Sequence, residues 1–198
     1  MKSSLEEKSL LYKVQTQKDP EAFALLYDVY VQPIYRFVYF KISHKEEAED
    51  VTGEVFLKCW QYLSGGKGSE IRSLSALLYT IARNQIIEVY RRRASRPDTP
   101  LDADLELGDK GRTAQLIEVK EEIEKLMHLL KKLKQEYQEV LLLRYVEEFS
   151  IGEIATITGK THTSVRVTLH RATKKLKNLA DDIHLYAGMG TQSTEPPK

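Results

Sequence analysis

The stretch from residue 149 to residue 177 constrains the fold of this chain more than any other part of it. Ser150 and Glu153 have the spacing of a capping box, which predicts the start of a short apolar helix. Gly159 ends that helix, and a longer one follows from about His162. The apolar positions of the longer helix are three and four residues apart: Val165, Leu169, Ala172 and Leu176. A short helix, a glycine turn and a longer helix form a helix-turn-helix.

The longer helix of this motif is strongly basic. Residues 160–177 contain six Lys and Arg side chains and no Asp or Glu. With its apolar stripe turned inward, the outer face fits the major groove of DNA, where N-terminal residues reach base edges and C-terminal lysines reach phosphates. A merely solvated basic face at a helix C-terminus is the alternative, but the preceding helix and turn favour DNA contact. The predicted contact residues are Thr161, Thr163, Ser164, Arg166, Val167, His170, Arg171 and Lys174.

The whole chain has helical patterning and no strand-like alternation of useful length, which predicts an all-α protein. Its net charge of +1 conceals an acidic middle. Residues 1–97 carry 15 Lys and Arg against 12 Asp and Glu, a net +3; residues 98–126 carry 4 against 9, a net −5; residues 127–198 carry 11 against 8, a net +3. Local charge governs DNA affinity more than total charge.

We expect two small helical domains, residues 1–96 and 115–180, a flexible acidic linker at 97–114, and a partly disordered tail at 181–198.

In the first domain, several helix boundaries can be read from capping residues. Asp19 followed by Pro20 predicts a helix start, and Pro33 should kink or split that helix. Ser43 and Glu46 suggest a capping box for the next helix. Gly53 lies inside that next helix and should cost about 1 kcal/mol relative to Ala. Its inward stripe is Ala48, Val51, Val55 and Cys59, and the other side carries Glu47, Asp50, Glu54 and Lys58.

A further helix is expected to begin near Ser73 and to end in a cluster of arginines before Pro97. Asn84 and Gln85 in this helix have amides that suit base edges, although Asn84 equally suits a local backbone bond. From the residues alone, the basic cluster is either a DNA contact or a solvated helix end. The glycine-rich loop at 64–69 lacks the spacing of a phosphate-binding loop and is interpreted as a connector.

Nothing in the sequence predicts catalysis. The single cysteine, Cys59, follows the core stripe and cannot form an internal disulfide or a cysteine-based metal site, which fits a reducing cytoplasm. The five histidines show no ligand pairing, and no nucleophile with a base is evident. We therefore expect no enzyme activity, no metal, no cofactor and no small-molecule substrate. Neither a signal peptide nor a membrane span is predicted.

Three stretches in order across the linker resemble a protein family. Residues 48–60, residues 78–93 and residues 137–176 are similar to the three conserved parts of a bacterial sigma factor of the small, two-domain extracytoplasmic-function type. The resemblance covers about residues 19–177. It implies a dissociable initiation subunit that binds the clamp and flap of core RNA polymerase, reads promoter DNA, and is held by an anti-sigma factor. Such a protein is cytoplasmic and joins the nucleoid when bound to polymerase.

The resemblance also implies roles for particular residues. The helix that contains Gly53 corresponds to the polymerase-binding helix, with contacts from Glu47, Asp50, Val51, Glu54, Val55 and Lys58. The loop from Ser69 to Ser73 matches the place where a flipped non-template base is held. Contacts to the minus-ten element are implied for Ser69, Arg72, Arg83, Asn84, Arg91, Arg92 and Arg93, and the helix-turn-helix corresponds to the reader of the minus-thirty-five element. The linker resembles the segment near the active-site channel and the RNA exit.

Three positions depart from the family pattern. Gly53 stands where Gln is usual, Lys134 where Pro is common, and Thr168 where a basic residue is frequent in the recognition helix. Two other readings of the sequence are a stand-alone helix-turn-helix regulator and a helical protein-interaction adaptor. A response regulator would need an α/β receiver domain, which the strand-free residues 1–97 do not offer. An adaptor predicts unchanged binding when Arg166 and Arg171 become alanine.

Overall fold

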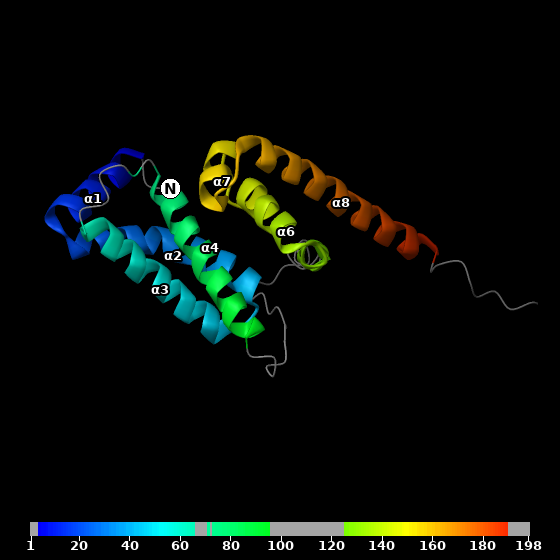
Figure 1. Ribbon diagram of the computed structural model, residues 1–198, viewed down its shortest axis with the longest axis horizontal. Coiled ribbons are helices and arrows are strands. Elements are labelled where there is room, and N and C mark those ends of the chain that lie inside the picture. Colours follow the sequence, from blue (N-terminus) through cyan, green and yellow to red (C-terminus); the bar gives the residue numbers. More distant parts are fainter. Residues whose placement is uncertain (1–3, 66–70, 72, 96–124, 190–198) are drawn as a thin grey trace, which may run out of the picture. The chain divides into compact units, whose positions relative to one another are not determined.

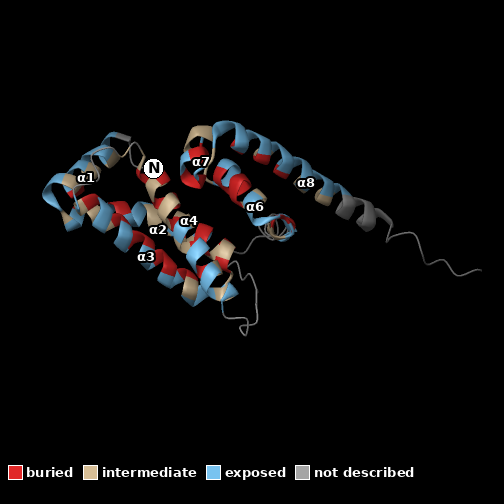
Figure 2. Ribbon diagram, in the orientation of Figure 1, coloured by how far each residue is buried: buried red, intermediate tan, exposed pale blue. Residues whose placement is uncertain are grey.

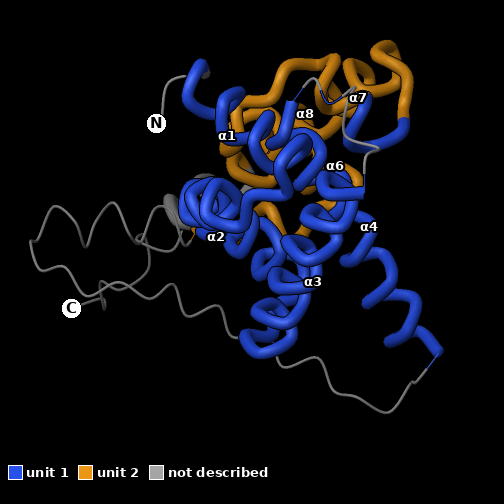
Figure 3. Tube along the Cα trace, turned by 90° about the vertical axis from the view of Figure 1, so that its left-hand side faces the viewer, with its two compact units in different colours: residues 1–107, 156–159 blue, residues 108–155, 160–198 orange. Residues whose placement is uncertain are grey.

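A computed structural model describes residues 4–65, 71, 73–95 and 125–189 of the 198. Within these ranges the regular structure is helical and contains no strand, which confirms the predicted all-α class (Figure 1). The chain divides into two compact units, residues 1–107 with 156–159 and residues 108–155 with 160–198 (Figure 3). The predicted linker at 97–114 lies outside the described residues, as do Ser69 and Arg72.

The first unit is a bundle of four helices. They are α1 (Ser4–Gln17), α2 (Pro20–Ile42), α3 (Lys45–Ser64) and α4 (Leu74–Ala94). Helix α2 packs against α1, α3 and α4, and α3 also packs against α4. Ile34, Val38, Val55, Ala82 and Val89 are completely buried between these helices. The apolar side chains at helical spacing thus meet in one core, as the sequence pattern predicted.

Of two helix starts predicted in this unit, one is confirmed and the other is wrong. The Asp19 carboxylate accepts hydrogen bonds from the backbone N–H groups of Glu21 at 2.9 Å and Ala22 at 3.1 Å, so the predicted cap of α2 is confirmed. The capping box predicted at Ser43 is wrong. Ser43 ends α2 in the left-handed conformation at φ 56°, and the Nδ1 atom of His44 caps α3 instead, accepting from the Glu47 N–H at 3.3 Å.

Pro33 and Cys59 both lie within helices of the first unit. Helix α2 continues through Pro33 without a break, so the alternative of a split helix is wrong. Cys59 is completely buried, and this burial raises the pKa of its thiol to about 12. The prediction that Cys59 belongs to the core stripe is therefore confirmed.

The predicted helix-turn-helix falls in the second unit except for residues 156–159. Residues 125–131 are helical, followed by α6 (Gln135–Leu141), a π-helical turn η2 (Leu142–Val146), α7 (Ile151–Thr158) and α8 (His162–Met189). Helix α6 packs along α8. The core of this unit is formed by apolar residues from each helix, including Val140, Leu143, Ile154, Val165 and Ala172. Helix α8 continues to Met189, past residue 181 where the tail was predicted to begin.

Both ends of α7 have the local structure that the sequence predicted. The Ser150 N–H and hydroxyl donate to the Glu153 carboxylate at 2.9 and 2.8 Å, and the Glu153 N–H donates to the Ser150 hydroxyl at 3.3 Å, which confirms the capping box. Gly159 has φ +67°, and the Lys160 N–H reaches back to the Ala155 carbonyl at 3.0 Å. This left-handed glycine and its hydrogen bond terminate α7 and allow α8 to start in a new direction.

Candidate nucleic-acid interface

The outer face of α8 is the largest set of predicted contact residues that the structure describes. All eight are exposed, and they begin at the N-terminal end of the helix: Thr161, Thr163, Ser164, Arg166, Val167, His170, Arg171 and Lys174. Most of the described length of α8 is coloured as exposed (Figure 2). The side chains of Val165 and Ala172 are completely buried on the opposite side. The helix therefore presents hydroxyl, imidazole and guanidinium groups together on one solvent-facing surface, as required for contacts with base edges and phosphates.

Thr161 has a local structural task as well. Its hydroxyl oxygen accepts a hydrogen bond from the Ser164 N–H at 3.2 Å, and its carbonyl accepts from the Val165 N–H at 3.0 Å. Thr161 thus caps the N-terminus of α8. The hydroxyl hydrogen is not used by this cap, so the same side chain retains a donor toward solvent.

Thr168 does not belong to the exposed face. Its side chain is buried at 7% exposure, and its hydroxyl donates to a carboxylate oxygen of Glu136 in α6 at 3.4 Å. Glu136 also forms an ion pair with Lys160, and the hydrogen bond from Lys160 is the main cause that lowers the pKa of this carboxyl. Thr168 is the position where the family often has a basic residue, and Lys160 is one of the six basic residues in the stretch 160–177. The three-residue spacing from Val165 was the signal that Thr168 lies on the inward stripe.

Helix α4 places its predicted DNA contacts in unequal environments. Asn84, Arg91 and Arg92 are exposed, whereas Arg83 is half-buried. Arg93 is half-buried and forms an ion pair with Glu47 of α3, while its Nη1 donates to the Ile42 carbonyl at 3.3 Å. The pairing joins a residue predicted to contact DNA to one predicted to contact polymerase, and nothing in the local sequence announces it.

Helix α3 carries the predicted polymerase-binding residues, and the structure divides them. Asp50, Glu54 and Lys58 are exposed, and Glu47 is half-buried. Val51 and Val55 are only 5% and 0% exposed. Their assignment as surface contacts needs correction, because the apolar stripe of α3 turns them into the core of the unit. The stripe itself was visible in the sequence.

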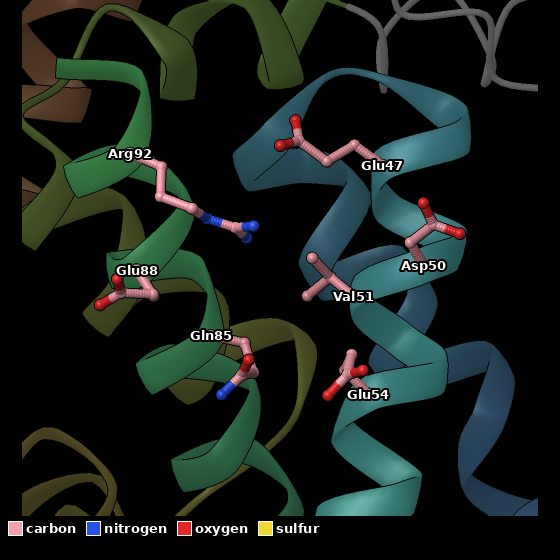
Figure 4. A pocket seen from close by; sticks show the side chains of 7 residues that line it. All are labelled: Glu47, Asp50, Val51, Glu54, Gln85, Glu88 and Arg92. Carbon is pink, nitrogen blue, oxygen red and sulfur yellow. The ribbon is translucent and has the colours of Figure 1, made fainter. Parts of the chain in front are cut away.

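A groove of about 530 Å³ lies between α3 and α4. Glu47 extends from α3 toward α4, and Arg92 extends from α4 toward α3 (Figure 4). The groove is lined by Glu47, Asp50, Val51 and Glu54 of α3 and by Gln85, Glu88 and Arg92 of α4. The polymerase-binding set from the sequence therefore shares one surface with part of the minus-ten set.

The described part of the chain shows neither a metal-ion cluster nor a membrane-spanning helix. No cluster of three or more His, Cys, Asp or Glu side chains there is arranged to hold a metal ion. None of the helices described there combines the length and the apolar character that crossing a membrane requires.

Comparison with known proteins identifies the family. The family model for Sigma-70 region 2 matches residues 26–96, and the one for Sigma-70, region 4 matches residues 123–176. RNA polymerase sigma factor YlaC of Bacillus subtilis is 34% identical over 154 residues, which cover 77% of this chain and 88% of the relative. This chain belongs to the sigma-70 family of sigma factors. ECF RNA polymerase sigma factor SigW of the same species is 30% identical over 177 residues, covering 83% of this chain and 92% of SigW, which supports the extracytoplasmic-function (ECF) group.

Further relatives of this sigma factor agree with that assignment. ECF RNA polymerase sigma factor BldN of Streptomyces coelicolor is 28% identical over 166 residues, and the match spans 83% of this chain but 62% of BldN. The solved structure of CnrH, in complex with the cytosolic domain of CnrY, has a TM-score of 0.66 at 20% identity and covers 89% of this chain and 98% of CnrH. CnrH thus shares the fold. Sigma factors direct transcription initiation, so the predicted class of function is confirmed and the regulator and adaptor alternatives are set aside.

Proposed function

We propose that this sigma factor reads the minus-thirty-five promoter element with the outer face of α8. The exposure of all eight predicted α8 contacts, with Val165, Thr168 and Ala172 buried between them, is the observation that carries the proposal. Arg166 and Arg171 suit bidentate bonds to guanine, and Lys174 suits a phosphate. Since the end of the helix is anchored by the cap at Thr161, the side chains are held on a rigid element.

We further propose that α4 reads the minus-ten element, together with Ser69 and Arg72. The exposure of Asn84, Arg91 and Arg92 on α4 supports this role. An amide suits the edge of an unstacked base, and guanidinium groups suit the neighbouring phosphates. The two compact units of the chain support the predicted division into residues 1–96 and 115–180 joined by the linker at 97–114, with one domain for each element.

The partners of the protein follow from the same division. We propose that the exposed acids of α3, Asp50 and Glu54, with Lys58 beside them, bind the clamp of the largest polymerase subunit, and that the second domain binds the flap. CnrH has been solved in complex with the cytosolic domain of CnrY, and the sigma factor RpoE of Bartonella quintana in complex with the anti-sigma factor NepR. By analogy, an anti-sigma factor holds this chain inactive. The protein then works in the cytoplasm and at the nucleoid, without enzymatic activity or a small-molecule substrate.

Reconstitution with core RNA polymerase and a promoter library tests this function. We expect co-purification with core and transcripts that start downstream of one pair of sequence elements. The double variant Arg166→Ala/Arg171→Ala should lose selection at the upstream element alone. A control that removes two exposed lysines of the same unit, Lys132→Ala/Lys134→Ala, should keep that selection. Failure to bind core, or selection that survives loss of both arginines, would reject the proposal.

Salt dependence gives a second measure of α8. If its face neutralises about four phosphates, the affinity for duplex DNA should fall with a log–log slope near −3.6. The slope is measured with the holoenzyme on a duplex that carries only the upstream element. A slope near zero would mean that the basic face is merely solvated.

A further inference from the structure

The C-terminal end of α4 is attached to the corner where α2 turns into α3. The Tyr90 hydroxyl donates to the Lys41 carbonyl at 2.5 Å, and Arg93 Nη1 donates to the Ile42 carbonyl at 3.3 Å. The other nitrogen of the same guanidinium, Nη2, forms the ion pair with Glu47 in the first turn of α3. Two side chains of α4 therefore contact both helices that meet at Ser43.

The chemistry of this corner suits a guanidinium better than any other group. The last carbonyls of a helix have no N–H partner within it, and the negative end of the helix dipole attracts a cation. Lys41 and Ile42 are the final residues of α2, so Tyr90 and Arg93 supply donors to carbonyls that need them. A planar guanidinium can satisfy a carbonyl with one nitrogen and a carboxylate with the other, which the ammonium of a lysine does less well.

The neighbouring arginines are placed differently. Arg91 pairs with Glu88 of its own helix at 3.0 Å, and their side chains are 72% and 49% exposed. An ion pair with this exposure is weak and can be exchanged for a phosphate. The side chains of Arg93 and Glu47 are only 29% and 33% exposed, and Arg93 has the additional bond to Ile42. To reach DNA, Arg93 would have to break contacts with two other helices.

We propose that Arg93, with Tyr90, is a positioning residue that fixes α4 to the corner of α2 and α3, and that it does not contact DNA. Its partner Glu47 holds the guanidinium and is removed from the polymerase-contact set. The position of Asn84 relative to the polymerase-binding helix α3 then depends on this attachment. The inference rests on the proposed role of α4 in reading the minus-ten element.

The test uses the full chain bound to saturating core polymerase, so that a change in core affinity does not enter. Binding to a promoter fork with a single-stranded minus-ten element is measured over a range of salt, and open complexes are measured on a duplex promoter. Arg91→Ala should reduce the salt slope by about 0.7, the value for one phosphate contact to a single strand. Arg93→Ala should leave the slope unchanged and lower open-complex formation roughly fivefold.

The partner variants separate positioning from DNA contact. Glu47→Ala should give the same loss of about fivefold, and the double variant Glu47→Ala/Arg93→Ala should also lose about fivefold instead of about 25-fold, because both changes break one attachment. Arg93→Lys, which keeps the charge beside Glu47, should recover part of the loss. If Arg93→Ala does not fold, Arg93→Gln carries the salt measurement, since it removes the charge and keeps most of the side chain, and Tyr90→Phe carries the open-complex measurement, since it removes one hydrogen bond.

Two results would overturn the proposal: a slope reduced by about 0.7 in Arg93→Ala, or losses from Glu47→Ala and Arg93→Ala that multiply. A failure of the underlying function looks different. In that case Asn84→Ala and Arg91→Ala would change neither the salt slope nor the open complexes. Thermal unfolding of the single and double variants would still reveal the coupling between Glu47 and Arg93, so the two failures are told apart.

Discussion

Helices α8 and α4 are both rich in basic residues, yet their basic groups have different environments. On α8 the predicted contacts are all exposed, and the residues on the opposite side of the helix are buried in the core. On α4 the three consecutive arginines include two exposed residues, Arg91 and Arg92, and one, Arg93, that is paired with another helix. A run of basic residues therefore predicts a DNA-binding surface only where those side chains are not already paired with a neighbouring helix.

The largest expected effect concerns the exposed face of α8. Arg166→Ala/Arg171→Ala should weaken binding of the holoenzyme to the minus-thirty-five element by about 2–6 kcal/mol, since each bidentate contact to guanine contributes about 1–3 kcal/mol. Fluorescence anisotropy with a duplex of that element measures the loss. The control Lys132→Ala/Lys134→Ala removes the same charge from exposed sites elsewhere in the unit. Equal losses for both pairs would remove the distinction between α8 and the general basic surface.

The second prediction removes the support beneath α8. Ile154 of α7 is completely buried, and Ile154→Ala should destabilise the second unit by about 2–5 kcal/mol through lost burial and the cavity left behind. Chemical denaturation followed by circular dichroism measures this change. Ile154→Val is the milder control, with an expected cost of about 0.5–1.5 kcal/mol. Two variants of equal and small effect would show that α7 is not part of the packed core.

The third prediction concerns Gly53 in α3. It is exposed, and a Cβ atom added there would meet nothing within 4 Å. Gly53→Ala should therefore stabilise the first unit by about 1 kcal/mol, because alanine favours the helix. Gly53→Gln should stabilise it too, and in addition should raise the affinity for core polymerase if the family's glutamine is a contact. Thermal melts and a core titration separate the two effects; a destabilised Gly53→Ala would contradict the helix argument.

The smallest effect is expected for Glu136, which joins α6 to α8. The hydrogen bond from Lys160 lowers the pKa of this carboxyl from its ordinary value of 4.5, so its contribution is present above that pH and is lost as the pH falls through the lower folded value. Its side chain is 47% exposed, which limits the contribution to at most about 1 kcal/mol. Glu136→Gln should thus melt lower than the wild type at pH 7, and the difference should shrink as the pH is lowered through and below 4.5.

The sequence predicted most of the α8 site and less of the α4 site, for a physical reason. The capping box at Ser150, the turn at Gly159 and the apolar stripe are local features, and together they decide which side of α8 faces solvent. The corresponding stripe of α3 places Val51 and Val55 inward, so the errors at these two residues came from giving family position precedence over helical spacing. At the start of α3 the cap is His44 and not the predicted Ser43, because Ser43 takes the αL conformation in which α2 ends.

The sequence by itself thus determined the helices, the helix-turn-helix, the core stripes and the family. Tertiary structure decided which charged groups remain available for a partner. Glu47 and Arg93 are 46 residues apart, and Glu136 and Thr168 are 32 apart, so no local pattern links them. Helical periodicity specifies which residues share one face of a helix. Which residues of other helices contact that face is decided only when the helices pack. The pairing of Arg93 with the corner of α2 and α3 is therefore a property of the folded bundle.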